Sequence, residues 1–275
     1  MAFLKRALPR SESVSSLLLL FSAMVLHSEE KAEPKKPEPP EITVVIPLGV
    51  TSGVTNHIQI RGQNLTNVTQ LRFTDTNCHA EFIIKSKGKA EVPKELEAKR
   101  IGDTQLELDL FLTVDAPIGT NSFSVISPQG ESQPHLLLIL APGSVVLEKE
   151  PNGGFRDAQE IRFGQRLQGT IREARDVDVY RFHGAAKQKI ISEVIAARFG
   201  SPLDSLLTLY DEGGHILAAN DDSNSSVDSV LRAELPADGT YFLSLMDAHD
   251  RGSPAHVYQL VLTDSTPAPD LNGSR

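Results

Sequence analysis

Short β-rich runs, in many of which apolar and polar residues alternate, follow one another from Ile42 to Asp264, separated by turn residues. Alternation with a period of two is typical of strands that turn one face to a core and the other to water. In the first half, the runs are ITVVIP, HIQIRG, VTQLRF, AEFIIK, QLELDLFL, NSFSVIS and HLLLIL. They predict an antiparallel sandwich over residues 42–142, with at most one short helix, in EVPKELEAKR at residues 91–100.

A second series of strand-like runs occupies residues 144–264. These runs are RLQGTI, DVYRF, KIISEVIA, LLTLYD, HILAA, SVLRAEL, TYFLSL and VYQLVL. Eight short strands at this spacing predict a second sandwich or a jelly roll. The fold class we expect is therefore all-β, with two β-sandwich domains, followed by a disordered tail at residues 265–275.

The N-terminal residues have the pattern of an export signal. Lys5, Arg6 and Arg10 precede an apolar stretch of roughly a dozen residues, which suits a signal-peptide core and is short for a membrane span. We interpret residues 1–28 as a signal peptide, with an uncleaved anchor as the alternative. Residues 29–41, rich in Pro, Glu and Lys, predict an extended linker.

Composition excludes several function classes. The formal net charge of −9 argues against binding to nucleic acid, which needs clustered Lys and Arg. Cys78 is the only cysteine, so no disulfide can form within the chain, and its role is either packing or pairing with another chain. The absence of Trp and an aromatic content of 5% weaken the case for a sugar-stacking platform.

The first block resembles a known family of immunoglobulin-like domains. GVTNHIQIRGQNL, at residues 53–65, has Ile58 and Ile60 at core-facing positions, Gly62 and Asn64 at a tight turn, and Leu65 at the end of the sandwich. This arrangement, with DAPIGTNSFSV and SPQG further on, resembles the IPT/TIG domain over most of residues 42–142. KSKGKAEVPKELEAKR is an insertion relative to that family.

The second block resembles the bacterial pre-peptidase C-terminal (PPC) domain, a β-sandwich appended to secreted peptidases and other exported proteins. EKEPN, DVDVYRF, LDSLLTLYDEGGHILAANDD and LPADGTYFLSL occur in the family's order across residues 148–245. Members that bind collagen carry a calcium site, and the resemblance places it here at Glu148, Glu150, Asn152, Asp176 and Asp178. Carboxylates and an amide suit calcium, a hard cation that takes about 6 to 8 oxygens. Gly153 and Gly154 stand where the family often has one more ligand.

A weaker second candidate lies in and near the loop NDDSNSSVDS. Asp221, Asp222 and Asp228 sit there, and the fold could bring Asp204 close. Close carboxylates raise one another's pKa and so favour a cation. Alternatively, these residues are solvated turn formers, which is also open for the first set.

Nothing in the sequence indicates catalysis. No G-x-S-x-G or H-E-x-x-H motif occurs, and Asp247, His249 and Asp250 fall in an expected hairpin loop. We therefore expect a non-catalytic binding or adhesion protein, exported to the periplasm, cell surface or exterior. Its partner would be an extracellular polymer, either fibrous protein or polysaccharide. The alternative is an accessory module that assists or localises a secreted peptidase or other hydrolase. We expect no nucleic-acid partner and no membrane insertion after signal cleavage.

Overall fold

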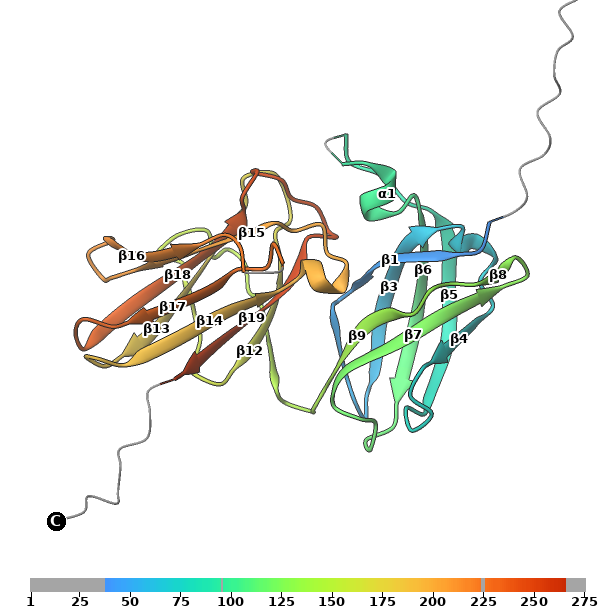
Figure 1. Ribbon diagram of the computed structural model, residues 1–275, viewed down its shortest axis with the longest axis horizontal. Helices are drawn as coiled ribbons and strands as arrows, with labels where there is room; N and C mark the ends of the chain where they lie inside the picture. Colours follow the sequence, from blue (N-terminus) through green and yellow to red (C-terminus); the bar gives the residue numbers. More distant parts are fainter. Residues whose placement is uncertain (1–37, 95, 224–225, 266–275) are drawn as a thin grey trace, which may run out of the picture. The chain divides into compact units, whose positions relative to one another are not determined.

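The computed structural model describes residues 38–94, 96–223 and 226–265. The expected signal peptide, most of the linker and nearly all of the tail lie outside these residues. The described residues form four β-sheets with very short helical turns, so the all-β class is confirmed (Figure 1). Among these residues, no helix has the length and apolar character needed to cross a membrane.

The first sandwich is built from two sheets, ordered β1-β3-β6-β5 and β2-β9-β7-β4, with β8 paired to β7. Ile58, Ile60 and Leu65 are 0% exposed in the core between them, as their alternation predicts. The elements are β1 Glu41–Ile46, β2 Gly49–Thr51, β3 Thr55–Gln63, η1 Leu65–Asn67, β4 Gln70–Phe73, β5 Ala80–Lys89, α1 Ala98–Ile101, β6 Thr104–Leu112, β7 Gly119–Ser127, β8 Gly130–Glu131 and β9 His135–Leu140.

The turn after β3 shows why Gly62 and Asn64 stand in the motif GVTNHIQIRGQNL. Gly62 packs so closely on β1 that a Cβ would lie 1.8 Å from the carbonyl oxygen of Glu41. Asn64 has a φ of 57°, in the left-handed region that Asn tolerates better than most residues. Together they let the chain turn and insert Leu65 into the end of the sandwich.

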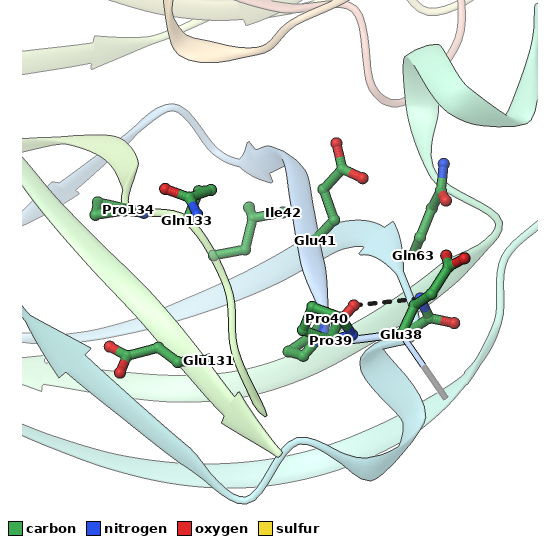
Figure 2. A pocket seen from close by; sticks show the side chains of 10 residues that line it. Glu38, Pro39, Pro40, Glu41, Ile42, Gln63, Glu131, Gln133 and Pro134 are labelled. Atoms are coloured by element: carbon green, nitrogen blue, oxygen red, sulfur yellow. Dashed lines mark hydrogen bonds between the residues drawn. The ribbon is translucent and has the colours of Figure 1, made fainter. Parts of the chain in front are cut away.

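The last residues of the expected linker pack against the first sandwich. Pro40 is buried, β1 already begins at Glu41, and Asn64 Nδ2 donates a hydrogen bond to the Pro39 carbonyl at 3.3 Å. Figure 2 shows the pocket of about 380 Å³ that results. Its lining is Glu38, Pro39, Pro40, Glu41, Ile42, Gln63, Asn64, Glu131, Gln133 and Pro134.

The second sandwich also has two sheets, ordered β10-β12-β19-β14-β17 and β11-β13-β18-β15-β16. They enclose a separate apolar core that includes Tyr180, Phe182 and Tyr258. The elements are β10 Val145–Leu147, β11 Gln159–Glu160, β12 Arg166–Thr170, β13 Val177–Gly184, β14 Lys189–Ile195, η2 Ala197–Phe199, β15 Ser205–Tyr210, β16 Ile216–Asn220, β17 Val230–Glu234, β18 Gly239–Asp247 and β19 Val257–Asp264.

Candidate metal centre in the second sandwich

Four side chains meet where the chain enters the second sandwich: Glu148, Glu150, Asn152 and Asp178, called here the Glu148 cluster. The first three follow β10, and the carbonyl of Asn152 accepts a hydrogen bond from the Val179 N–H at 2.9 Å. This bond fastens residues 148–152 to β13, beside Asp178.

Strand periodicity turns Asp178 toward the interior. Successive side chains of a strand alternate between its two faces, so Asp178 shares a face with Tyr180 and Phe182. Both aromatic residues belong to the core, and Asp178 is 0% exposed. The motif DVDVYRF therefore buries a carboxylate at the edge of an apolar core, where a charge is costly without partners.

Three carboxylates of the cluster face one another. Glu148, Glu150 and Asp178 each present an oxygen, and these oxygens lie within 4.8 Å of one another. The side chains of Glu148 and Glu150 are 4% and 29% exposed. Arg172 is the cation paired with them, with nitrogen–oxygen distances of 3.7 Å to Glu148 and 3.5 Å to Glu150. Arg172 carries a single positive charge and is 57% exposed, so it balances at most one of these carboxylates.

Two buried tyrosines complete the floor of the cluster. The Tyr258 hydroxyl lies 2.5 Å from Oδ2 of Asp178 and 3.1 Å from Oε1 of Glu148, and it is hydrogen-bonded to the Tyr180 hydroxyl. The Tyr180 hydroxyl lies 3.3 Å from the same Glu148 oxygen. Each hydroxyl has a single proton, so two protons serve several competing oxygens. The backbone N–H groups of Thr170 and Asn152 donate to Glu148 and Glu150 at 3.1 and 3.2 Å, so the shortage of donors falls on Asp178.

This crowding changes the acidity of the buried groups. Burial, and then the hydrogen bond and charge of Glu148, raise the pKa of Asp178 to about 9. Burial also raises the pKa of Tyr180 and Tyr258 well above the ordinary value. Asp178 is therefore in an environment that favours either a bound proton or a nearby cation.

The side-chain amide of Asn152 can be placed in two orientations, which exchange its oxygen and nitrogen and have the same shape. Its inward atom lies 2.9 Å from Oε2 of Glu150 and 3.1 Å from Oδ1 of Asp178. If that atom is nitrogen, it donates to both carboxylates. If it is oxygen, three oxygens converge, and the outward nitrogen donates to Oε1 of Glu148 at 3.3 Å. Without an ion, the first orientation satisfies the hydrogen bonds of the amide. The second orientation is the one that would offer an amide oxygen, beside the carboxylates, to a cation such as calcium.

Asp176 and the two glycines lie outside this group of oxygens. The carboxylate of Asp176 accepts a hydrogen bond from the backbone N–H of Arg172 at 2.6 Å, which closes the turn between β12 and β13. Gly153 and Gly154 follow Asn152 and bring no side-chain oxygen. The structure thus brings together four of the five residues that the resemblance placed in the first set.

The residues of the second candidate set do not converge on one point. Asp228 is buried, and its carboxylate accepts hydrogen bonds from the backbone N–H groups of Ala196, Ala197 and Arg198 at 3.1, 2.7 and 3.4 Å. Asp204 lies 3.3 Å from His249 and 3.8 Å from Arg251, and Asp221 and Asp222 are exposed. Within the described part of the chain, only the Glu148 cluster brings three potential anionic ligands together.

Asp247 does not lie in the hairpin loop where the sequence predicted it. It is the last residue of β18 and is 1% exposed. Its carboxylate accepts hydrogen bonds from the Arg251 Nε at 3.0 Å and from the backbone N–H of His249 at 2.9 Å. These bonds shape the turn after β18, which is a structural role.

Sequence reasoning missed Tyr180, Tyr258 and Arg172 as parts of the site. Tyr180 could have been found, because it lies two residues after Asp178 on the same strand face. Tyr258 is 80 positions from Asp178, and no local pattern predicts that contact.

Comparison with known proteins gives a family match for part of the second sandwich. Residues 176–245 match the bacterial pre-peptidase C-terminal domain. The matched PPC stretch contains Asp178, Tyr180 and most of the second sandwich, whereas Glu148, Glu150 and Asn152 precede it. The IPT/TIG resemblance of residues 42–142 stays a prediction.

A curated relative and two solved structures show similarity to the chain. The relative is a probable subtilase-type serine protease of Deinococcus radiodurans, 29% identical over 216 residues, which are 74% of this chain and 28% of that protein. The chain therefore spans under a third of that relative's length.

The first structure is the PPC domain of a Bacillus anthracis collagenase, which is 17% identical in sequence and superimposes with a TM-score of 0.33. The match covers 42% of this chain and 100% of that domain. The second is PliG of Aeromonas hydrophila, a periplasmic inhibitor of g-type lysozyme, with 15% identity, 44% and 97% covered, and a TM-score of 0.30.

Proposed function

We propose that the chain is an exported, non-catalytic binding module whose second sandwich holds calcium at the Glu148 cluster. One observation carries the proposal: three mutually facing carboxylates and an amide meet beside a single half-exposed cation, Arg172. Calcium takes about 6 to 8 oxygen ligands from carboxylates, amide carbonyls and water. The protein would supply the carboxylates of Glu148, Glu150 and Asp178 and the side-chain carbonyl oxygen of Asn152.

The ion's contribution would be positive charge in a cluster rich in acceptors. The chain's own residues hold the segment in place. The backbone carbonyl of Asn152 fastens it to β13, and Phe155, three residues later, stacks on Phe242 at a distance of 4.3 Å between ring centroids. A bound ion would therefore order the surface loop that follows β10. The partner of this surface, in our proposal, is an extracellular fibrous protein or polysaccharide.

A second function has its own support. The aligned relative is a probable subtilase-type serine protease, and this chain corresponds to 28% of it. An accessory module that assists or localises a secreted peptidase would explain that alignment. Co-purification of the full chain with an exported peptidase, at a fixed stoichiometry, favours this function over independent adhesion.

A thermal-melt titration of the full chain tests the calcium site. A ligand that binds only the folded state increases the free energy of unfolding by mass action, by about 2.7 kcal/mol at a concentration of 100 Kd, and so raises the melting temperature. For a folded part of this size, we expect a rise of about 5–10 °C. The titration runs to about 10 mM, above the 10⁻⁴–10⁻³ M range of extracellular calcium modules.

Matched variants make the test specific. Glu150→Gln and Asp178→Asn keep the side-chain size, remove a carboxylate and should abolish most of the rise. Asp221→Asn removes an exposed carboxylate outside the cluster and should respond like the unmodified chain. An unchanged melting temperature in calcium, or an equal rise in all variants and in magnesium, would refute the site.

A further inference from the structure

The strand β16 ends one sheet of the second sandwich and pairs only with β15 in the sheet order (Figure 1). An edge strand presents backbone N–H and C=O groups that another extended chain can pair with. Proteins usually protect such edges with charged residues, proline or very short strands. Whether β16 has this protection decides what the edge can do.

Within the described residues, β16 is the only edge strand longer than three residues that has no charged residue. Its sequence is ILAAN. By contrast, the edge strand β5 of the first sandwich carries exposed lysines at Lys85, Lys87 and Lys89. The edge at β5 therefore has charged residues that protect it against an added strand. The edge at β16 has none, and its one irregularity is a bulge in the pairing with β15 between Ile216 and Ala218.

An apolar surface continues from β16 across the sheet. Ile216 is 65% exposed, and it lies opposite Tyr210, which lies opposite Phe242 on the next strand. Phe155, 37% exposed, stacks on Phe242 and packs edge-on against Tyr210 at 5.2 Å between ring centroids. Side chains of an added strand would find apolar contacts here as well as backbone partners.

Charge determines which strand would fit. The stretch from Leu203 to Leu231 has no Lys or Arg, and its exposed acidic residues are Glu212, Asp221 and Asp222. Asp211 and Glu212 precede β16, and Asp221 and Asp222 follow it, so acidic groups stand at both ends of the strand. A second copy of this chain would bring the same acidic ends together, and facing like charges destabilise a strand pair.

We propose that β16 is a docking edge for an extended peptide segment that has an apolar centre and basic residues at both ends. The segment adds a strand to the sheet by backbone hydrogen bonding. Its apolar side chains lie on the surface formed by Ile216, Tyr210 and Phe155. Its basic ends face the acidic residues beside β16. Five residues of β16 span roughly 17 Å, so the paired part of the partner is about five residues long.

Binding of the peptide Lys-Lys-Val-Thr-Val-Thr-Val-Lys-Lys to the full chain, measured by fluorescence anisotropy, tests this edge. We expect saturable binding that Ile216→Lys weakens about tenfold or more, equal to about 1.4 kcal/mol, because a lysine there repels the basic partner. Ile83→Lys, on the edge strand β5, is the matched control, since Ile83 is 63% exposed. It should leave the affinity unchanged, and melting curves should show that both variants are folded.

Two further probes separate strand addition from simple charge attraction. The same peptide with alternate backbone amides N-methylated keeps every charge and loses the backbone donors, so it should bind at least about tenfold more weakly. Equal binding of the methylated peptide, or equal affinity of Ile216→Lys, would overturn the proposal. Light scattering that shows a dimer, converted to a monomer by Ile216→Lys, would assign the edge to a second copy and also overturn it.

Discussion

Two aspartates of the second sandwich are equally hidden from solvent but have opposite acidities. Asp178 is 0% exposed, and burial together with Glu148 raises its pKa to about 9. Asp247 is 1% exposed, and burial alone would raise its pKa as well. Hydrogen bonds from the Arg251 side chain and from backbone N–H groups outweigh burial and lower the pKa of Asp247.

The difference shows that burial alone does not set the charge of an interior carboxylate. Burial is the main cause of the raised pKa of Asp178, whereas the hydrogen-bond donors around Asp247 together outweigh it. The Asp247 carboxylate is paired with the Arg251 guanidinium and accepts hydrogen bonds from three backbone N–H groups, so its negative charge is fully compensated. Asp178 meets another carboxylate and tyrosines whose protons are shared, so its site lacks positive charge. The first arrangement stabilises a turn, and the second suits a cation.

The largest expected effect comes from Asp247→Asn. Removing one partner of a buried pair leaves the other without compensation, which typically costs about 3–5 kcal/mol. Because Arg251 is 18% exposed and partly hydrated, we expect about 3 kcal/mol, at the lower end. Urea denaturation at neutral pH gives the free energy of unfolding. A loss below about 1 kcal/mol would mean that the pair contributes little, and the contrast with Asp178 would fail.

A smaller effect should appear in acid. An unfolded aspartate has a pKa of about 3.9, and that of folded Asp247 is lower, so its stabilising contribution is present above about pH 4. The contribution is lost as the pH falls through the folded pKa. Between about pH 5 and pH 3, the unmodified chain should therefore lose more unfolding free energy than Asp247→Asn. Parallel curves for the two proteins would contradict the lowered pKa.

The smallest effect is expected for Asp178→Asn in the presence of a chelator. Because the raised pKa keeps a proton on Asp178 at neutral pH, an amide of the same shape replaces a neutral group. Stability should change by less than about 1 kcal/mol in urea denaturation. A loss as large as that of Asp247→Asn would show that Asp178 is an ionised, fully paired carboxylate.

Short β-rich runs between turn residues, many of them alternating with a period of two, predicted every strand of five or more residues in the described part of the chain. The strands β2, β8, β10 and β11 were not predicted, since two or three residues are too few to show a period. They form through pairing with longer strands, as β10 does with β12.

The candidate site was predicted in part. The family resemblance named Glu148, Glu150, Asn152 and Asp178, which the structure gathers, but it also named Asp176, which caps a turn. For the second set, Asp228 looked like a loop carboxylate, yet the backbone around η2 uses it as an acceptor.

The sequence alone determined the strands, the side chains that face each core and the acidic character of the segments around β13 and β16. These are local properties, set by alternation and by residue type. Only the tertiary structure decided which carboxylates face one another and which face donors. Strand pairing within the sheet β10-β12-β19 brings Glu148 to Tyr258, 110 positions away. The pKa values follow from such contacts rather than from neighbours in the chain.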